Sequence, residues 1–199
     1  GVYRGSKPNA GALFYLQGGP GIESIDWSRG MFDDYVAPLR EEYDMIFFDP
    51  RGTGRSRPLL ECPELTSIYL GAFFQTRSED ESFSLFTDAW ARCNKRFMAE
   101  GIDPSAFNTT QSAADVRDIV AALGYEKVNL FGISYGTRLA LTIMRDHPEI
   151  VRSVVIDSVV PIQRKMINSR SEDIQYALDK MFADCANSPA CNDAYPGLQ

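Results

Sequence analysis

Short apolar runs recur along the chain at residues 12–16, 43–48, 127–131 and 152–156. Each is five or six residues long, and none shows the regular alternation of apolar and polar positions that a half-exposed strand has. They are therefore predicted to be strands covered on both faces, as in a parallel sheet. Val2 and Tyr3 are at most the end of a further strand.

Apolar residues between these runs recur every three or four positions, which is the period of an amphipathic helix. This spacing predicts helices over 27–40, 84–100, 109–123, 137–145 and 171–182. The helix over 109–123 is expected to have Thr110 or Ser112 as its N-cap and to stop at Gly124. The acidic residues at 78–81 are expected in a loop or at a helix start.

Strands and helices alternate along most of the chain. This order is typical of an α/β fold, in which a mostly parallel sheet carries helices on both faces. The segment 185–196 is rich in Cys, Asn and Pro and departs from this rhythm. The chain is therefore predicted to divide into an α/β core over residues 1–163 and a helical element over residues 164–199.

Composition narrows the class of function. The 199 residues include 44% apolar residues and carry a formal net charge of −7. Nucleic acid is not expected as a partner, because no basic stripe is available to neutralise phosphates. No membrane span is expected either, because no apolar stretch approaches the ~20 residues that cross a bilayer.

Four cysteines bear on the redox compartment. Their spacings match no zinc-binding pattern and the sequence has one histidine, so neither a metal nor another cofactor is expected. The even count favours two disulfides, Cys62–Cys93 and Cys185–Cys191, the second closing a short local loop. Disulfides would indicate an oxidising compartment, secreted or periplasmic. The alternative is four free thiols in a cytosolic enzyme.

A candidate catalytic motif lies between the third apolar run and the helix predicted after it. Residues 132–136 read Gly-Ile-Ser-Tyr-Gly, which fits the Gly-x-Ser-x-Gly nucleophile elbow. So tight a strand-to-helix turn strains the serine backbone, and the flanking positions are glycine because larger side chains would collide there. The Ser134 hydroxyl would then stand clear at the carboxyl end of the strand. The alternative is an ordinary strand–glycine–helix junction.

Two further loops follow predicted strands, at the edge where open α/β sheets bind ligands. Residues 17–21 read Gln-Gly-Gly-Pro-Gly. A phosphate-binding loop is disfavoured because the Lys-Ser/Thr of a P-loop is missing, which leaves an oxyanion loop or a plain tight turn. In the second loop, over 49–56, Asp49 and Arg51 could be catalytic charges, but a structural role in holding the loop is favoured.

Together these three motifs resemble the α/β-hydrolase fold, and more narrowly the proline iminopeptidase and tripeptidyl aminopeptidase group of serine peptidases. Residues 18–21 match that group's His-Gly-Gly-Pro-Gly loop, with Gln17 in the place of the histidine. Residues 49–56 are similar to its Asp-x-Arg-Gly-x-Gly-x-Ser motif. The stretch from Asp184 to Pro196 looks like the start of the helical cap in the secreted tripeptidyl aminopeptidase branch.

The resemblance implies a catalytic arrangement. Ser134 would be the nucleophile, and the main-chain amides of Gly19 and Tyr135 would form the oxyanion hole, with Gly18 a less favoured donor. The implied activity is that of an aminopeptidase, which releases short peptides or single residues from peptide N-termini through an acyl-enzyme. An esterase on the same scaffold and a non-catalytic scaffold protein are the alternatives.

A serine hydroxyl needs an adjacent base, and in this fold the histidine comes last in chain order. His147 lies thirteen residues after Ser134, and a helix of that length would put it roughly 20 Å away. It is interpreted as a helix-end residue, while Asp157 is kept as a low-ranked triad acid. We therefore expect an internal portion of a longer hydrolase, incomplete at both ends of the core. The remainder would supply the Asp and the His, and the isolated chain would be inactive.

Overall fold

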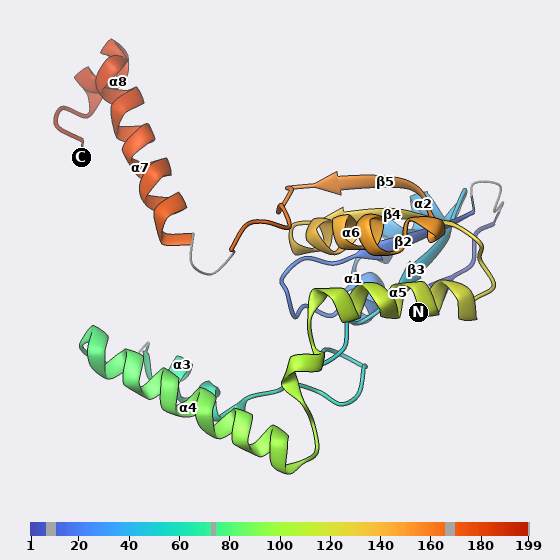
Figure 1. The fold of residues 1–199 in the computed structure, drawn as a ribbon. Coiled ribbons are helices and arrows are strands. Elements are labelled where there is room, and N and C mark those ends of the chain that lie inside the picture. The colour runs from blue at the N-terminus through green and yellow to red at the C-terminus, as the bar shows by residue number, and fades with distance from the viewer. Residues whose placement is uncertain (7–10, 73–74, 166–169, 199) are drawn as a thin grey trace. The chain divides into compact units, whose positions relative to one another are not determined.

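A computed structural model describes residues 1–6, 11–72, 75–165 and 170–198 of the chain. The chain forms two compact units, Gly1–Pro161 and Ile162–Gln199 (Figure 1). The first unit contains the sheet. Residues 166–169 and 199, which belong to the helical element predicted over 164–199, lie outside the described residues.

The sheet consists of β1 (Val2–Tyr3), β2 (Ala12–Leu16), β3 (Asp44–Phe47), β4 (Val128–Ile133) and β5 (Val151–Asp157). Its spatial order is β1-β3-β2-β4-β5. All pairings among β2, β3, β4 and β5 are parallel, whereas β1 is antiparallel to β3. The mostly parallel sheet predicted from the sequence is confirmed. Because β2 and β4 are neighbours, the loops that follow them emerge side by side.

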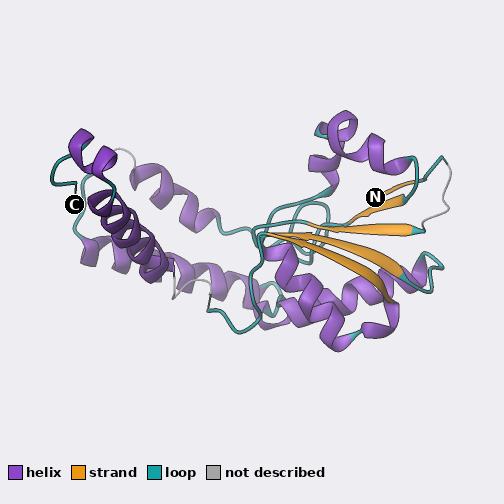
Figure 2. Cartoon of the chain, turned by 90° about the horizontal axis from the view of Figure 1, so that it is seen from above, coloured by secondary structure: helices purple, strands orange, loops and turns teal. Residues whose placement is uncertain are grey.

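Helices cover both faces of this sheet, as predicted (Figure 2). One face carries α1 (Ile25–Gly30) and the π-helical turn η1 (Phe32–Val36), which continues into α2 (Ala37–Arg40). The other face carries α5 (Thr109–Ala122) and α6 (Tyr135–Asp146), and the turn η3 (Pro148–Ile150) leads into β5. Between β3 and α5 lie α3 (Pro63–Ala72), α4 (Glu79–Ala99) and the turn η2 (Pro104–Ala106).

Every residue of β2 is buried, because both faces of this central strand are covered. Side chains alternate between the two faces of a strand. Phe14 and Leu16 pack in the core that includes α5 and α6, whereas Leu13 and Tyr15 pack in the core that includes η1. A continuous apolar run in the sequence therefore corresponds to a strand that contributes to two cores.

Two predicted helix boundaries were wrong. The single helix expected over 27–40 is interrupted at Met31, between α1 and η1, and η1 then continues into α2. Gly30, the last residue of α1, weakens helical structure, which accounts for the break. The helix expected from residue 84 starts at Glu79, because Ser78 and Glu81 form a reciprocal capping box.

The start of α5 also differs from the prediction. Its N-cap is Asn108, whose side chain accepts a hydrogen bond from the Gln111 amide at 2.9 Å. The expected caps Thr110 and Ser112 lie inside the helix. α3 was not predicted, because its apolar residues show little helical periodicity.

The second unit contains α7 (Arg170–Asn187), which is longer than the predicted 171–182, and α8 (Pro189–Ala194). The disulfide Cys185–Cys191 joins the end of α7 to α8, with Cα atoms 5.1 Å apart. In the described part of the chain, no helix is both long enough and apolar enough to cross a membrane.

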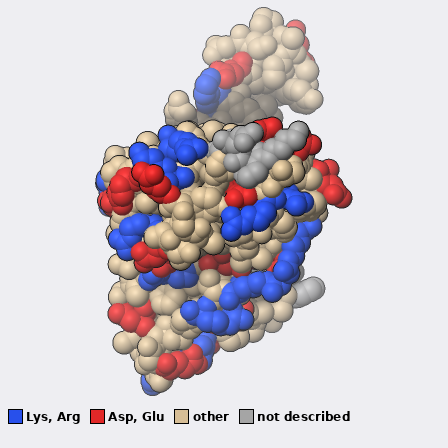
Figure 3. All heavy atoms as spheres, turned by 90° about the vertical axis from the view of Figure 1, so that its right-hand side faces the viewer, with Lys and Arg blue, Asp and Glu red and all other residues tan. Residues whose placement is uncertain are grey.

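Charged side chains of both signs are interspersed on the surface. Figure 3 shows the right-hand side of Figure 1, where the amino ends of the parallel strands lie, with basic and acidic side chains next to one another. The ion pairs of the described residues follow the same pattern, such as Arg145 with Asp146 at 2.6 Å. Neighbouring charges of opposite sign therefore partly neutralise one another.

Candidate active site

One residue, Ser134, separates β4 from α6. Its φ of 53° and ψ of −120° form a backbone conformation that residues other than glycine rarely adopt. A Cβ atom on Gly132 would lie 2.5 Å from the carbonyl oxygen of Gly136. A Cβ atom on Gly136 would lie 1.9 Å from the carbonyl oxygen of Leu16. Packing therefore requires glycine on both sides of the serine.

Hydrogen bonds fix this elbow to β5 and to the segment after it. The Ser134 amide donates to the carbonyl of Asp157 at 2.9 Å. The Thr137 hydroxyl donates to the Ser134 carbonyl at 2.6 Å and accepts from the Val160 amide at 2.8 Å. The Ser134 side chain is half-buried, and no described residue hydrogen-bonds its Oγ. The hydroxyl is therefore available to a substrate and to a base.

The glycine-rich loop after β2 passes directly against Ser134. A Cβ atom on Gly18 would lie 3.3 Å from the Cβ and 3.7 Å from the Oγ of Ser134. The side chain of Gln17 accepts a hydrogen bond from the Gly18 amide at 2.9 Å, so this amide is already engaged. The next residue, Gly19, has a φ of +117° and precedes a cis peptide bond to Pro20. The loop thus runs beside the hydroxyl, which is a requirement of an oxyanion loop.

Asp49 holds two of the loops at this edge together. Its buried carboxylate accepts hydrogen bonds from the amides of Ser24 at 2.7 Å and Ile25 at 3.0 Å. The same carboxylate accepts from the Arg55 amide at 2.8 Å. It therefore ties the segment after the glycine-rich loop to the 49–56 loop, which is the structural role favoured from the sequence.

Arg51 connects the same loop to α5. Its guanidinium donates to the Asp115 carboxylate at 2.6 and 2.8 Å and to the carbonyl of Ala106 at 2.7 Å. The hydrogen bond to Asp115 raises the pKa of Arg51. Arg51 is therefore a charged structural link within the fold.

A cleft of about 1440 Å³ opens beside these loops. Three parts of the first unit contribute most of its lining: the segment 50–62, α4 and residues 104–112. The glycine-rich loop contributes Pro20 and Gly21. The Tyr135 side chain also lines the cleft, and its hydroxyl lies 2.8 Å from the Thr109 hydroxyl at the start of α5. Since Tyr135 directly follows Ser134, the cleft reaches the elbow.

His147 and Asp157 were the other two polar residues considered from the sequence. His147 follows α6 at the end opposite Ser134, and its Nδ1 lies 3.6 Å from a carboxylate oxygen of Glu149. It is a helix-end residue, as interpreted from the sequence. Asp157 touches the elbow through its carbonyl, while its carboxylate accepts a hydrogen bond from the Ser158 hydroxyl at 3.1 Å. No described residue therefore stands as the base for Ser134.

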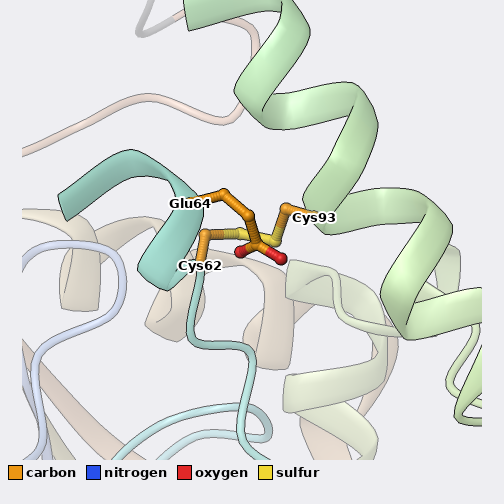
Figure 4. A group of neighbouring side chains, drawn as sticks. All are labelled: Cys62, Glu64 and Cys93. Atoms are coloured by element: carbon orange, nitrogen blue, oxygen red, sulfur yellow. A yellow bond between two sulfur atoms is a disulfide. The ribbon is translucent and has the colours of Figure 1, made fainter. Parts of the chain in front are cut away.

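Cys62, Glu64 and Cys93 form the group of possible metal ligands found among the described residues (Figure 4). The two sulfurs are joined in a disulfide, with Cα atoms 5.5 Å apart, so neither is a thiolate ligand. Hydrogen bonds from Arg96 at 2.8 and 3.2 Å lower the pKa of the Glu64 carboxyl. The group is a covalent and ionic link between α3 and α4. Both disulfides predicted from the sequence are thus present.

Two features of the site were missed from the sequence. The contact of Gln17 with Gly18 depends on the bend of the loop, which residue types do not reveal. Trp90 was placed on a helix, but helical spacing does not indicate what the helix faces. The available signal was that Trp90, Asn94 and Phe97 recur at i, i+4 and i+7, on one face of α4.

The chain is similar to several known proteins. The family described as the alpha/beta hydrolase fold matches residues 11–194. The serine protease Hip1 of Mycobacterium tuberculosis is 30% identical over 193 residues, which cover 91% of this chain and 36% of Hip1. The tripeptidyl aminopeptidase of Streptomyces lividans is 32% identical over 194 residues, which cover 92% of this chain and 35% of that enzyme. The chain thus spans about a third of the length of these relatives.

A solved structure of an esterase from a marine microorganism shares the fold. Its TM-score is 0.51 at 14% sequence identity, and the match covers 99% of this chain and 58% of the esterase. At this identity the similarity concerns the fold alone.

Proposed function

The chain belongs to the alpha/beta hydrolase fold family, and on that premise we propose that the protein is a serine hydrolase whose nucleophile is Ser134. The observation that carries the proposal is the approach of the glycine-rich loop to this serine, since a Cβ atom on Gly18 would lie 3.7 Å from Ser134 Oγ. A hydroxyl on a strained turn beside a main-chain loop is the arrangement that acyl transfer requires.

The proposed oxyanion hole consists of the main-chain amides of Gly19 and Tyr135. Tyr135 is the first residue of α6, and its amide is one of the unpaired donors at the positive end of the helix dipole. Gly19 is preferred to Gly18 because the Gly18 amide donates to Gln17. In the reaction these two amides would stabilise the negative charge that develops on the substrate oxygen.

The proposed base is a histidine, with an acidic partner, from a further portion of the hydrolase. Two observations support this. The chain spans about a third of its curated relatives, and β5 has a strand neighbour on one side, with Val155 55% and Ile156 36% exposed. A further parallel strand beside β5 would cover these side chains and bring its carboxyl end to the edge that holds Ser134. Asp157 remains the lower-ranked candidate for the acid.

The proposed substrate is a peptide with a free N-terminus, from which the enzyme releases a short peptide or a single residue. The support is the three-motif resemblance and the relative named tripeptidyl aminopeptidase. Ser134 Oγ would bond to the scissile carbonyl carbon while its proton passes to the base. The C–N bond then breaks, the amine leaves with that proton, and water hydrolyses the acyl-enzyme by the same steps.

Two further assignments belong to this proposal. Residues 164–199 would be the start of a helical cap. The protein would be secreted or periplasmic, and the two disulfides support an oxidising compartment, because such bonds are rare in the reducing cytosol.

The test uses the complete protein, a fluorophosphonate probe and two serine variants. The probe is expected to label the wild type at Ser134, and Ser134→Ala is expected to abolish both labelling and hydrolysis. Ser84→Ala, which changes an exposed serine on α4, is the matched control and should behave as the wild type. Labelling elsewhere, or hydrolysis that survives Ser134→Ala, would contradict the proposal.

The peptide specificity needs its own measurement, because an acyl-enzyme forms from an ester or an amide alike. Peptidyl-coumarin substrates with free and acetylated N-termini are compared with p-nitrophenyl esters. An aminopeptidase is expected to prefer the free amine strongly. Hydrolysis of esters alone would replace the peptidase assignment with that of an esterase and leave the role of Ser134 intact.

A further inference from the structure

We propose that α4 forms the specificity-determining wall of the cleft, and that Trp90 receives a large apolar side chain of the peptide residue beside the scissile bond. This inference rests on the proposed function of Ser134. It assigns a substrate class to a part of the chain that lies between β3 and α5, far in sequence from the elbow and from residues 164–199.

The side chains that α4 presents to the cleft lie on one helical face. Trp90, Asn94 and Phe97 all line the cleft and are spaced by four and three residues. Phe97 is 5% exposed, whereas Trp90 is 55% exposed. A large aromatic side chain left half in water on a concave surface gains most by binding an apolar partner.

The wall and the proposed oxyanion loop line the same cavity. Pro20 and Gly21 directly follow Gly19, and Tyr135 directly follows Ser134. Pro20, Gly21 and Tyr135 line the cleft together with Trp90. Ser134 and Gly19 are not among the lining residues, but the residues that follow them are. A ligand whose carbonyl lies at Ser134 would therefore reach the space in front of α4 by passing Tyr135 and Pro20.

The position of the wall is fixed at its base. The Leu60 amide donates to the carbonyl of Gly52 at 3.0 Å. This hydrogen bond attaches the residues that lead into α3 to the 49–56 loop. The Cys62–Cys93 disulfide then joins the segment before α3 to the middle of α4 (Figure 4). Cys93 lies between Trp90 and Phe97 in α4, so the cross-link holds the part of the helix that faces the cleft.

The lining favours the apolar part of a peptide. Two of its guanidinium groups are neutralised by carboxylates, Arg55 by Asp26 at 2.8 Å and Arg51 by Asp115 at 2.6 Å. Its apolar lining includes Leu59, Leu60, Phe107 and Tyr135, beside Trp90 and Phe97. The volume of about 1440 Å³ exceeds the ~300–1,000 Å³ of small-molecule pockets, which suits several residues of an extended peptide.

The experiment uses the complete protein and two series of short peptides with free N-termini. One series carries Phe or Gly on the acyl side of the scissile bond, and the other carries them on the leaving-group side. Trp90→Ala and Trp90→Phe are compared with the wild type and with Phe83→Ala, which removes a 75% exposed aromatic side chain from α4 outside the cleft. The rate with p-nitrophenyl acetate serves as the measure of basal activity.

The wild type is expected to prefer Phe to Gly in one of the two series. Trp90→Ala should reduce that preference roughly 10- to 100-fold through kcat/KM, which is the range for losing part of an apolar subsite. Trp90→Phe should restore most of it, and Phe83→Ala should retain all of it. Phe83→Ala should hydrolyse the small acetate ester at the wild-type rate. The thermal unfolding midpoints of all four proteins show that each is folded.

A wild type without preference in either series would overturn the inference, as would a preference that survives Trp90→Ala. Ser134→Ala separates this failure from that of the proposed function. If Ser134→Ala is inactive while Trp90→Ala changes nothing, the serine hydrolase assignment stands and the role of the wall is wrong. If Ser134→Ala remains active, the proposed function itself fails.

Discussion

A Cβ atom on Gly136 would lie 1.9 Å from the carbonyl oxygen of Leu16. The first turn of α6 and the end of β2 are therefore in direct main-chain contact, and this contact brings the serine to the glycine-rich loop. Since a real Cβ atom never comes so close to an oxygen, any side chain here must push α6 away from β2.

Gly136→Ala is therefore expected to disrupt the elbow. The cost should exceed the 1–3 kcal/mol that is typical of overpacking, because the new Cβ atom would meet the main chain of Leu16, which cannot rotate away as a side chain can. We expect a lower thermal unfolding midpoint and a large fall in the labelling rate of Ser134. Gly30→Ala is the matched control, because a Cβ atom there meets no atom within 4 Å. An unchanged midpoint and labelling rate in Gly136→Ala would refute the packing argument.

Asp49→Ala is expected to destabilise the first unit and slow acylation. The substitution leaves three main-chain amides without their acceptor, and an unsatisfied buried donor costs about 1–3 kcal/mol. Asp49→Asn keeps one carbonyl acceptor and should lose less. Chemical denaturation and fluorophosphonate labelling measure the two effects. Asp88→Ala, at an exposed position on α4, should match the wild type in both.

Asp44 is expected to make stability depend on pH. Burial raises the pKa of its carboxyl, but hydrogen bonds from Tyr125, Gly5 and Arg4 outweigh burial, so the pKa lies below its usual value. A carboxyl with a lowered folded-state pKa stabilises the fold above its unfolded pKa of about 3.9, and this contribution is lost as the pH falls through the folded pKa.

The comparison of Asp44→Asn with the wild type tests this dependence. The variant should be less stable at pH 7, and the difference in free energy of unfolding should shrink as the pH falls below about 4. Urea denaturation at several pH values gives this difference directly. If the difference in free energy of unfolding stays constant down to pH 2.5, the charge of the Asp44 carboxylate does not contribute to stability.

The elbow was predictable from sequence because its constraint is local. Gly132 and Gly136 flank Ser134 at a spacing that only a tight strand-to-helix turn requires, and the apolar run before it marked the strand. The disulfides followed from the even number of cysteines. The elbow depends on residues close in sequence, and the disulfides depend on pairing four cysteines. The sequence pattern was therefore enough to predict both.

Features that depend on a distant partner were not predictable in the same way. The break between α1 and η1 lies inside a stretch with good helical spacing, and the cap at Asn108 lies outside the apolar pattern of its helix. The apolar residues of α4 show the same helical spacing whether Trp90 faces a core, solvent or a cleft. Its position over the cleft depends on the disulfide and on the loop over 49–56, which meet only in the folded chain.

The outer side of β5 has a practical consequence for recombinant work on these 199 residues. In the described sheet this strand pairs on one side, and its other side offers main-chain donors and acceptors next to Val155 and Ile156. Such a row is a template for any strand that meets it, including β5 of a second molecule. Concentrated solutions of these 199 residues should therefore aggregate through β5, which light scattering would detect.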